Sequence, residues 1–282
     1  MKIIESITET FSDYDGYVLD LWGVVHDGRR PYPGAVEALR ALKAAGKRVA
    51  FLTNAPRRAW FIDQMLVGMG ITADLHDGIM SSGEASWLLM KSGSDPRFGG
   101  PAFFIGTERD HSVLDEGVAT LVDEPTQARF LLNTGPDPSL GPHSVERYRA
   151  DLERCRAAGL PMLCVNPDRA VMVAGERVPC AGALADVYLE LGGVVVEIGK
   201  PDPAVYGPTL ALLGDMPKHR IVAVGDTAHT DLAGAMAAGL DSLWAMTGLF
   251  ANAHGDVAAE EIARLAAHQD VTPKAALRAL RV

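Results

Sequence analysis

Short apolar runs alternate along the chain with segments in which apolar residues recur every three or four positions. The short runs are typical of strands that are buried on both faces, and the longer segments are typical of amphipathic helices. Such alternation arises when helices cover both faces of a parallel sheet. The pattern therefore predicts an α/β fold with a Rossmann-like parallel-sheet core.

The alternation is clearest in the first and last thirds of the chain. In the first third, strands are expected at residues 16–20, 49–52 and 78–83, and helices at 33–46 and 57–68. Gly46 closes the first of these helices, as glycine commonly does after a helix end. In the last third we expect strands at 194–198, 221–225 and 243–246, and helices at 203–213 and 231–239. The tail from residue 258, including 273–280, is expected to form two short helices.

The middle of the chain has the length of a second α/β unit. Strand-like runs occur at residues 102–105, 129–132 and 162–165, and a helical pattern covers 144–158. No fixed period suggests a repeat protein. We predict a core domain made of residues 1–84 and 191–282, with residues 85–190 inserted as an α/β cap, or lid.

Composition narrows the class of partner. The 282 residues carry a formal net charge of −10 and no cluster of Lys and Arg, which argues against a nucleic-acid surface. The chain shows no apolar stretch of membrane-spanning length and no signal-peptide core, so a cytoplasmic protein without membrane partners is expected. Three cysteines without paired ligand spacing fit reduced, buried thiols. Small metabolites are the expected partners.

Residues suited to phosphoryl chemistry stand at or just beyond the carboxyl ends of four predicted strands. They are Asp20, Thr53, Lys200 and Asp226. Ligands bind outside the carboxyl ends of strands in open α/β sheets, so one pocket could hold all four side chains.

Three acids in this set provide a nucleophile and a cation site. Asp20 could attack phosphorus and also bind a hard cation. Asp226 would complete the cation site, because Mg²⁺ favours a few carboxylates together with water and phosphate oxygens. Asp231, one helical turn further on, could hold a metal-bound water. Mg²⁺ is therefore the expected cofactor.

The remaining residues would bind the phosphate group. Thr53 and the backbone amides around Asn54 would donate hydrogen bonds to phosphate oxygens, and Lys200 would neutralise both Asp20 and the bound dianion. Taken singly, each feature has a structural explanation, since an acid can cap a turn and Thr-Asn is common in turns. Their order on alternating strands favours a phosphate site.

The residues together resemble the haloacid dehalogenase (HAD) superfamily, specifically its class IIA branch of sugar-phosphatase-like and nitrophenylphosphatase-like proteins. Residues 166–168 and 179–183 look like parts of the large lid of that branch. The four family motifs correspond to residues 20–27, Thr53-Asn54, Lys200-Pro201 and 225–231.

The resemblance implies a hydrolase with a Rossmann-like core, a class II cap and an aspartyl-phosphate intermediate on Asp20. It also implies Mg²⁺ held by Asp20, Asp226 and the backbone carbonyl of Trp22. Asn166 and Asp168 would lie near the cap–core interface and help to bind the substrate, although Asn166-Pro167-Asp168 could equally be a structural turn. Caps of this family often take part in dimers, so a homodimer is one expected assembly.

One position departs from the family pattern. Phosphatases of the family carry a second aspartate two residues after the nucleophile, as general acid and then base, and here that position is Trp22. Indole cannot exchange a proton in that way. A positioned acid–base group is worth about 10² to 10⁴ in rate, so its loss should handicap the hydrolysis of unactivated alkyl phosphates.

Several consequences of this departure are open. His26 or Asp27 could swing in as a substitute acid, although His26 in a polar loop is otherwise expected to be solvated. The substrate could be an aryl or acyl phosphate with a good leaving group. The site could bind phosphate esters without turnover, as a non-catalytic or regulatory protein, or the chain could be a non-phosphatase hydrolase of the family. Trp22 is expected to fill the pocket wall, and Arg57 to be exposed rather than to reach the substrate.

Overall fold

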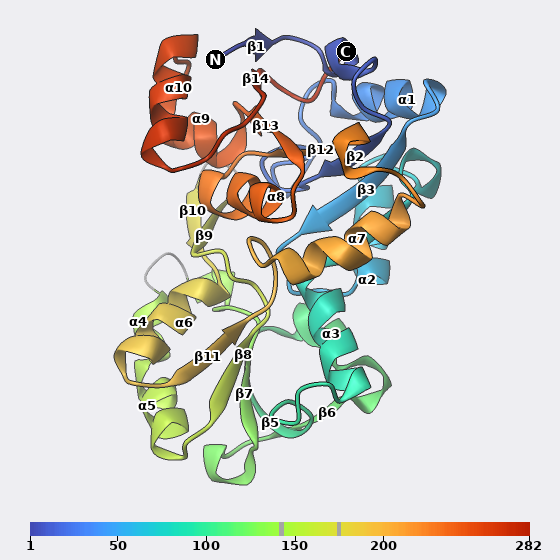
Figure 1. The fold of residues 1–282 in the computed structure, drawn as a ribbon. Helices are drawn as coiled ribbons and strands as arrows, with labels where there is room; N and C mark the ends of the chain where they lie inside the picture. Colours follow the sequence, from blue (N-terminus) through green and yellow to red (C-terminus); the bar gives the residue numbers. More distant parts are fainter. Residues whose placement is uncertain (141–143, 174–175) are drawn as a thin grey trace.

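The computed structural model describes residues 1–140, 144–173 and 176–282. Two parallel sheets form its two units, which lie one above the other in Figure 1. The core sheet has seven strands in the order β1-β14-β13-β12-β2-β3-β4, and the cap sheet has five in the order β11-β8-β7-β5-β6. The prediction of a Rossmann-like core with an inserted α/β cap is confirmed.

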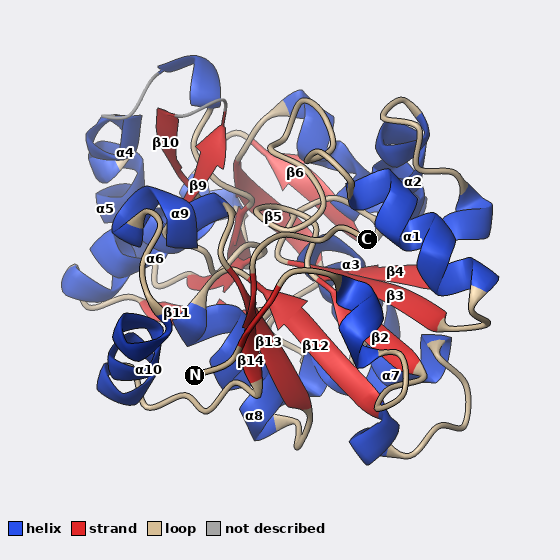
Figure 2. Cartoon of the chain, turned by 90° about the horizontal axis from the view of Figure 1, so that it is seen from above, coloured by secondary structure: helices blue, strands red, loops and turns tan. Residues whose placement is uncertain are grey.

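The core sheet is covered by helices on both faces (Figure 2). Its strands are β1 (Ile3–Ile4), β2 (Gly16–Leu19), β3 (Arg48–Thr53), β4 (Gly78–Ser81), β12 (Ile221–Gly225), β13 (Asp241–Ala245) and β14 (Ala275–Leu277). The helices of this unit are α1 (Ala35–Ala44), α2 (Ala59–Val67), α7 (Tyr206–Leu212), α8 (Ala233–Ala237), α9 (Gly248–His254) and α10 (Ala259–His268).

Alternate residues of β2 face the two helical layers. Leu19 packs in the core cluster that contains the buried residues of α1 and α2, whereas Val18 packs in the cluster that contains Tyr206 of α7 and Ala235 of α8. A strand that is covered on both faces must be apolar throughout, which explains why β2 and β12 read as continuous apolar runs.

The cap has its own parallel sheet and its own core. Its strands are β5 (Gly100–Ile105), β6 (Ala119–Val122), β7 (Phe130–Asn133), β8 (Pro161–Cys164) and β11 (Val194–Glu197). Helices α4 (Ser144–Arg147), α5 (Arg149–Ala157) and α6 (Ala181–Glu190) belong to it, and α3 (Ser82–Ser92) leads into it from β4. An antiparallel hairpin of β9 (Ala170–Val173) and β10 (Glu176–Pro179) extends from the cap toward α9.

Two expectations from the sequence are wrong. The run at residues 194–198 was expected among the core strands, but β11 pairs with β8 in the cap sheet. Its apolar pattern identifies a strand without saying which sheet it joins. The run at 273–280 was expected to be helical, but β14 pairs there with β1 and β13. Alanine favours helices, and this preference is overridden because a distant strand supplies the pairing. The domain boundaries remain predictions. Because β11 pairs in the cap sheet, the cap is better ended after Glu197 than at residue 190.

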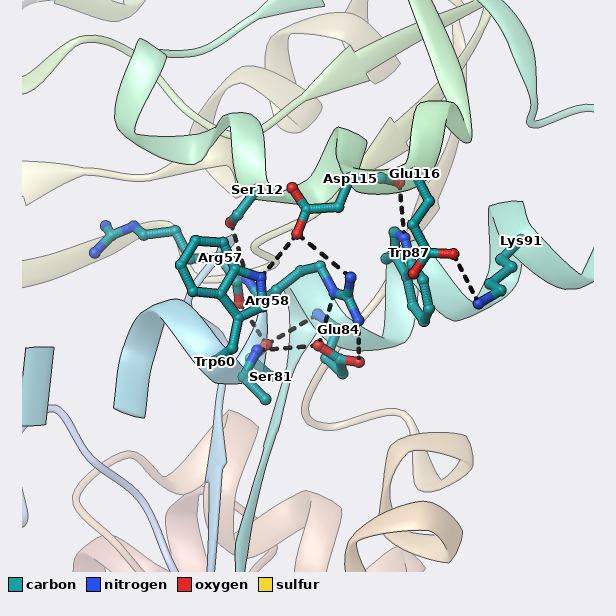
Figure 3. A network of polar contacts seen from close by, with 11 residues as sticks. Arg57, Arg58, Trp60, Ser81, Glu84, Trp87, Lys91, Ser112, Asp115 and Glu116 are labelled. Carbon is teal, nitrogen blue, oxygen red and sulfur yellow. Dashed lines mark hydrogen bonds and ion pairs between the residues drawn. The ribbon is translucent and has the colours of Figure 1, made fainter. Parts of the chain in front are cut away.

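A polar network fastens the cap to the core at the start of α2 (Figure 3). The Arg58 guanidinium donates to Glu84 of α3 at 3.0 and 3.1 Å and lies 3.4 Å from the Asp115 carboxylate of the cap. It also stacks over the Trp87 ring, and the Trp60 indole donates to Asp115 at 2.7 Å. We call Arg58, Trp60, Glu84, Trp87 and Asp115 the Arg58 clasp. Because the clasp joins α2, α3 and the cap, it fixes the cap on this side of the core.

In the described part of the chain, no helix combines the length and the apolar composition that crossing a membrane requires.

Candidate active site

Asp20 leaves the core sheet at the carboxyl end of β2. Its backbone amide still pairs with the Val224 carbonyl at 2.9 Å, and its Oδ1 accepts from the Leu21 amide at 2.8 Å. The chain then turns at Gly23, whose φ of 82° lies in the left-handed region. A Cβ at Gly23 would lie 2.1 Å from Oδ2 of Asp226, so glycine lets the turn pass close to that acid.

Three buried carboxylates meet beside one ammonium group. Asp20, Asp226 and Asp231, here called the acid triad, each offer one carboxylate oxygen within 4.8 Å of the others. Lys200 Nζ lies 2.8 Å from Oδ1 of Asp20 and 2.6 Å from Oδ1 of Asp231. The predicted neutralisation of Asp20 by Lys200 is therefore present, together with a second pairing, to Asp231, that the sequence did not indicate.

Burial and like charge shift the titration of these groups. Burial raises the pKa of Asp20 well above its usual range, despite the opposing charge of Lys200. Burial and the Asp231 charge raise the pKa of Asp226 to about 7, although the Leu249 amide donates to its Oδ2 at 2.6 Å. Burial alone would lower the pKa of Lys200, but the charges of Asp20 and Asp231 outweigh it and raise that pKa.

The acid triad fits a hard divalent cation. Three carboxylates against one ammonium leave an excess of buried negative charge, and oxygen donors are the ligands that Mg²⁺ and Ca²⁺ prefer. Asp20 and Asp226 project from neighbouring strands, because β2 and β12 pair directly. Asp231 is held through Oδ2, which accepts from the Thr227 amide at 3.1 Å.

Asn54 connects β3, the Lys200 segment and the cap. Its side-chain oxygen accepts from the Lys200 amide at 2.8 Å, and its side-chain nitrogen donates to the Lys200 carbonyl at 3.1 Å. The same nitrogen donates to Oδ1 of Asp168 in the cap at 2.8 Å. Thr53 is buried beside it, and its hydroxyl accepts from the Ala55 amide at 3.3 Å. Asn54 therefore positions Lys200 and touches the cap at once.

Two adjoining cavities reach these residues. A small one, of about 30 Å³, lies among the acid triad, Lys200, Trp22 and Asp168. A larger one, of about 580 Å³, lies between core and cap and is lined by Asp20, Trp22, Thr53, Asn166 and Asp168. Its wall also includes apolar side chains of the cap hairpin, Val171, Val173 and Val178. Apart from Asn54, every residue predicted to act as nucleophile, to bind the cation or to bind phosphate or substrate lines one of the two cavities.

Trp22 and His26 pack against each other beneath the larger cavity. Their rings meet edge to face, with centroids 5.3 Å apart. His26 is fully buried, its Nδ1 accepts from the Gly28 amide at 3.0 Å, and burial lowers its pKa to about 4. The expectation of a solvated His26 is wrong, because Trp22 and the turn enclose it. A neutral, enclosed imidazole is a poor substitute acid.

The Asp27 carboxylate accepts hydrogen bonds from the turn that follows it. Its Oδ1 accepts from the Arg29 and Arg30 amides, both at 2.9 Å. Slight burial raises the pKa of Asp27, but these two hydrogen bonds outweigh it and lower that pKa. Asp27 lines neither of the two cavities. The geometry therefore favours neither residue of this loop as the replacement acid.

The cap segment Asn166-Pro167-Asp168 forms a turn at the edge of the larger cavity. In this turn, Oδ1 of Asn166 accepts from the Asp168 amide at 3.0 Å. Asn166 and Asp168 also line the larger cavity. Arg57, expected on the surface, is buried in an ion pair of 2.9 Å with Asp110 of the cap. That pairing joins segments far apart in sequence, so no local pattern could have indicated it.

Comparisons with known proteins agree with this geometry. The family model described as haloacid dehalogenase-like hydrolase matches residues 17–117, and one described as HAD-hydrolase-like matches 197–270. A solved hydrolase of the haloacid dehalogenase-like family from Brucella suis is 31% identical, with a TM-score of 0.84, covering 98% of this chain and 99% of that one. The chain belongs to the haloacid dehalogenase-like hydrolases.

Several relatives of this chain are named as phosphatases. D-glycerol 3-phosphate phosphatase from Mycobacterium tuberculosis is 30% identical over 84% of this chain, and the match spans only 64% of that relative. Others, 25–27% identical, are named as a 5′-nucleotidase, a sugar-phosphatase and a 4-nitrophenylphosphatase. These names confirm the prediction of a phosphoric monoester hydrolase of the HAD family.

A solved relative also bears on the cation. The structure of a glycerol phosphate phosphatase from Mycobacterium tuberculosis in complex with calcium is 26% identical, with a TM-score of 0.63. It covers 84% of this chain and 68% of that one. A divalent cation therefore accompanies this fold in a relative, in agreement with the acid triad of the present chain.

Proposed function

We propose that the protein is a Mg²⁺-dependent phosphatase of small phosphorylated metabolites that works through an aspartyl-phosphate on Asp20. The observation that carries the proposal is the position of Asp20. Its buried carboxylate belongs to the acid triad and also lines a cavity large enough for a metabolite, and Lys200 contacts it at 2.8 Å. The nucleophile Asp20, the metal-binding carboxylates and the Lys200 ammonium that would bind phosphate therefore lie together in one site.

In the first step, Asp20 attacks phosphorus and the ester oxygen departs. Asp20, Asp226 and the Trp22 carbonyl would hold the cation, with Asp231 acting through a water. When bound, the cation would balance the charge of these carboxylates and of the phosphate. The Thr53 hydroxyl and the Lys200 ammonium would bind phosphate oxygens. Lys200 is already fixed for this role by its paired hydrogen bonds to Asn54.

In the second step, water attacks the phosphorus of phospho-Asp20. Inorganic phosphate leaves, and the Asp20 carboxylate is restored. The cap covers the reacting groups, because Asn166 and Asp168 close the larger cavity from the cap side. This enclosure limits bulk water at the site and strengthens the electrostatic interactions inside it.

The wall of the larger cavity bears on the choice of substrate. Trp22 and the valines of the cap hairpin offer apolar contact, while Asn166 and Asp168 offer polar contact to the part of the substrate distal to phosphate. Trp22 cannot protonate a leaving group. Esters whose leaving groups are stable as anions, such as aryl phosphates, are therefore the favoured class.

A substrate panel tests the proposed function. With Mg²⁺, p-nitrophenyl phosphate should be hydrolysed about 10²-fold faster than a sugar phosphate, because the leaving group of the sugar ester needs a proton. EDTA should abolish both activities, and added Mg²⁺ should restore them. Phosphate-ester binding without phosphate release from any panel member would favour the non-catalytic alternative. Activity that is indifferent to EDTA would contradict the cation site.

Restoring the family residue at position 22 tests the reason for this preference. Trp22→Asp should raise the rate on alkyl phosphates by about 10-fold or more and change the aryl phosphate rate much less, because only the alkyl leaving group needs a proton. The ratio of the two kcat/KM values is the measurement. Trp22→Phe serves as a control for loss of the indole, and a rise in alkyl rate in this variant too would contradict the explanation.

A further inference from the structure

We propose that Asp168 of the cap serves as general acid and base in place of the residue missing at position 22, with a smaller rate enhancement than an aspartate there would give, so that the preference for aryl esters remains. This inference rests on the proposed function and adds to it a catalytic residue from the other unit of the molecule. In the family, the general acid is the second aspartate, two residues after the nucleophile. This chain has Trp22 at that position, so the acid must come from elsewhere.

Asp168 occupies the boundary between the two cavities. It lines the small cavity with Asp20, Trp22 and the acid triad, and it also lines the larger cavity. A group in this place faces both the phosphorus-binding point and the part of the substrate that departs. In the described residues no hydrogen bond involves Oδ2 of Asp168, whereas Oδ1 accepts from Asn54. One carboxyl oxygen therefore remains for the substrate.

The position of Asp168 is fixed from three directions. The Asn166 side chain accepts from its amide at 3.0 Å, and its carbonyl accepts from the Gly182 amide at 3.1 Å. A Cβ at Gly182 would lie 2.7 Å from that carbonyl oxygen, so the start of α6 packs directly on the turn. The Asn54 side chain holds the carboxyl group itself at 2.8 Å. Such fixed placement is what proton transfer to a reacting group requires.

The charges around Asp168 suit a group that must gain and lose a proton. Burial is the largest influence and raises its pKa, with the Asp231 charge acting in the same direction. The Lys200 charge, the Asn54 hydrogen bond and the His229 charge act in the opposite direction and do not cancel the rise. The carboxyl therefore keeps its proton to a higher pH than an exposed aspartic acid does.

The other acids that line the two cavities in the described chain have different roles. Asp20, Asp226 and Asp231 form the acid triad. Asp110 is paired with Arg57 at 2.9 Å, and Glu176 is exposed on the hairpin. His26 and Asp27 line neither cavity. Asp168 is the remaining carboxyl group.

In the proposed mechanism, Asp168 both donates the proton of the first step and accepts the proton of the second step. As the Asp20–phosphorus bond forms and the ester bond breaks, the Asp168 carboxyl gives its proton to the departing oxygen, which leaves as an alcohol. The Asp168 carboxylate then takes a proton from the attacking water. The oxygen of that water bonds to phosphorus, the bond to Asp20 breaks, and inorganic phosphate leaves with Asp168 protonated again.

This assignment makes leaving-group protonation depend on the position of the cap. The hydrogen bond between Asn54 and Asp168 crosses from core to cap, so the acid is in place only while the two units are in contact there. Esters that need protonation would transfer their phosphoryl group to Asp20 only in the closed arrangement. Esters with good leaving groups would need Asp168 only in the second step, as the base for water.

The test compares Asp168→Asn with wild type on an alkyl and an aryl phosphate in the full-length, Mg²⁺-loaded protein. The variant amide can still accept from Asn54, so folding should be kept. The expected result is a loss of about 10²-fold or more in kcat/KM for the alkyl ester with little change for p-nitrophenyl phosphate. In wild type the alkyl rate should fall as pH rises through the Asp168 pKa, and this limb should be absent in the variant.

Two further variants separate catalysis from structure. Asp186→Asn removes a cap carboxylate that pairs with Arg169 on the surface, and both rates should remain nearly unchanged. Trp22→Asp in the Asp168→Asn background should recover the alkyl rate if the lost function is proton transfer. Equal losses on both esters, or no recovery, would overturn the role of Asp168 and leave the proposed function standing. Failure of wild type to release phosphate from any ester would instead overturn the proposed function.

Discussion

Asp20→Asn should lower kcat for every phosphate ester by at least about 10³-fold, because an amide is a far weaker nucleophile than a carboxylate and the covalent step is lost. The fold should persist, since the amide oxygen can still accept from the Leu21 amide. Removing one of three adjacent buried carboxylates also relieves repulsion, while Lys200 keeps its partner Asp231. The thermal midpoint of the metal-free variant should therefore equal or exceed that of wild type.

The measurements are phosphate release with Mg²⁺ and thermal unfolding in EDTA. Asp13→Asn, at an exposed position on the amino-terminal side of β2, is the matched control and should change neither. Unimpaired turnover by Asp20→Asn would remove Asp20 from the role of nucleophile. A large fall in the thermal midpoint would mean that the loss of activity reports unfolding rather than chemistry.

Lys200→Met should be the most destabilising single change at the site. Methionine fills similar space but leaves the Asp20 and Asp231 carboxylates buried without their ammonium partner. Breaking a buried pair in this way costs about 3–5 kcal/mol, and we expect that loss in the free energy of unfolding in EDTA at neutral pH. Turnover should fall about 10²-fold or more, because the cation that binds phosphate is also lost.

The dependence of the stability loss on Mg²⁺ and pH tests whether unpaired charge causes it. Mg²⁺ should raise the thermal midpoint of Lys200→Met more than that of wild type, since the ion replaces missing positive charge. The difference in stability should shrink in acid, where the carboxylates become protonated and no longer need a partner. Lys2→Met, which removes an exposed partner of Glu9, is the control and should leave stability nearly unchanged. A loss that is indifferent to both Mg²⁺ and pH would indicate packing rather than charge.

Local patterns were sufficient to place Asp20, Thr53 and Asp226 at one edge of a sheet. Each follows a run of apolar residues whose period and length are readable without the fold, and parallel strands bring their carboxyl ends to one edge. Lys200 was placed correctly beside Asp20 although the strand before it, β11, belongs to the cap sheet. Sheet membership depends on pairing with β8, about thirty residues earlier in the chain, and an apolar run carries no information about its partner.

Apart from the Lys200–Asp231 pair, the contacts that the sequence did not indicate are those made across the cap–core boundary and within the turn after Asp20. The hydrogen bond between Asn54 and Asp168 joins residues 114 positions apart. The burial of His26 depends on how Trp22 folds over it, and polar residues in a loop predict exposure instead.

The most direct test is acid quenching of the wild-type protein during turnover of p-nitrophenyl phosphate with Mg²⁺, followed by mass spectrometry of its peptides. The peptide that contains Asp20 should carry the added mass of one phosphoryl group, hydroxylamine should remove it, and Asp20→Asn should never show it. Turnover with no phosphoryl group on that peptide, or with the group on another residue, would contradict covalent catalysis by Asp20.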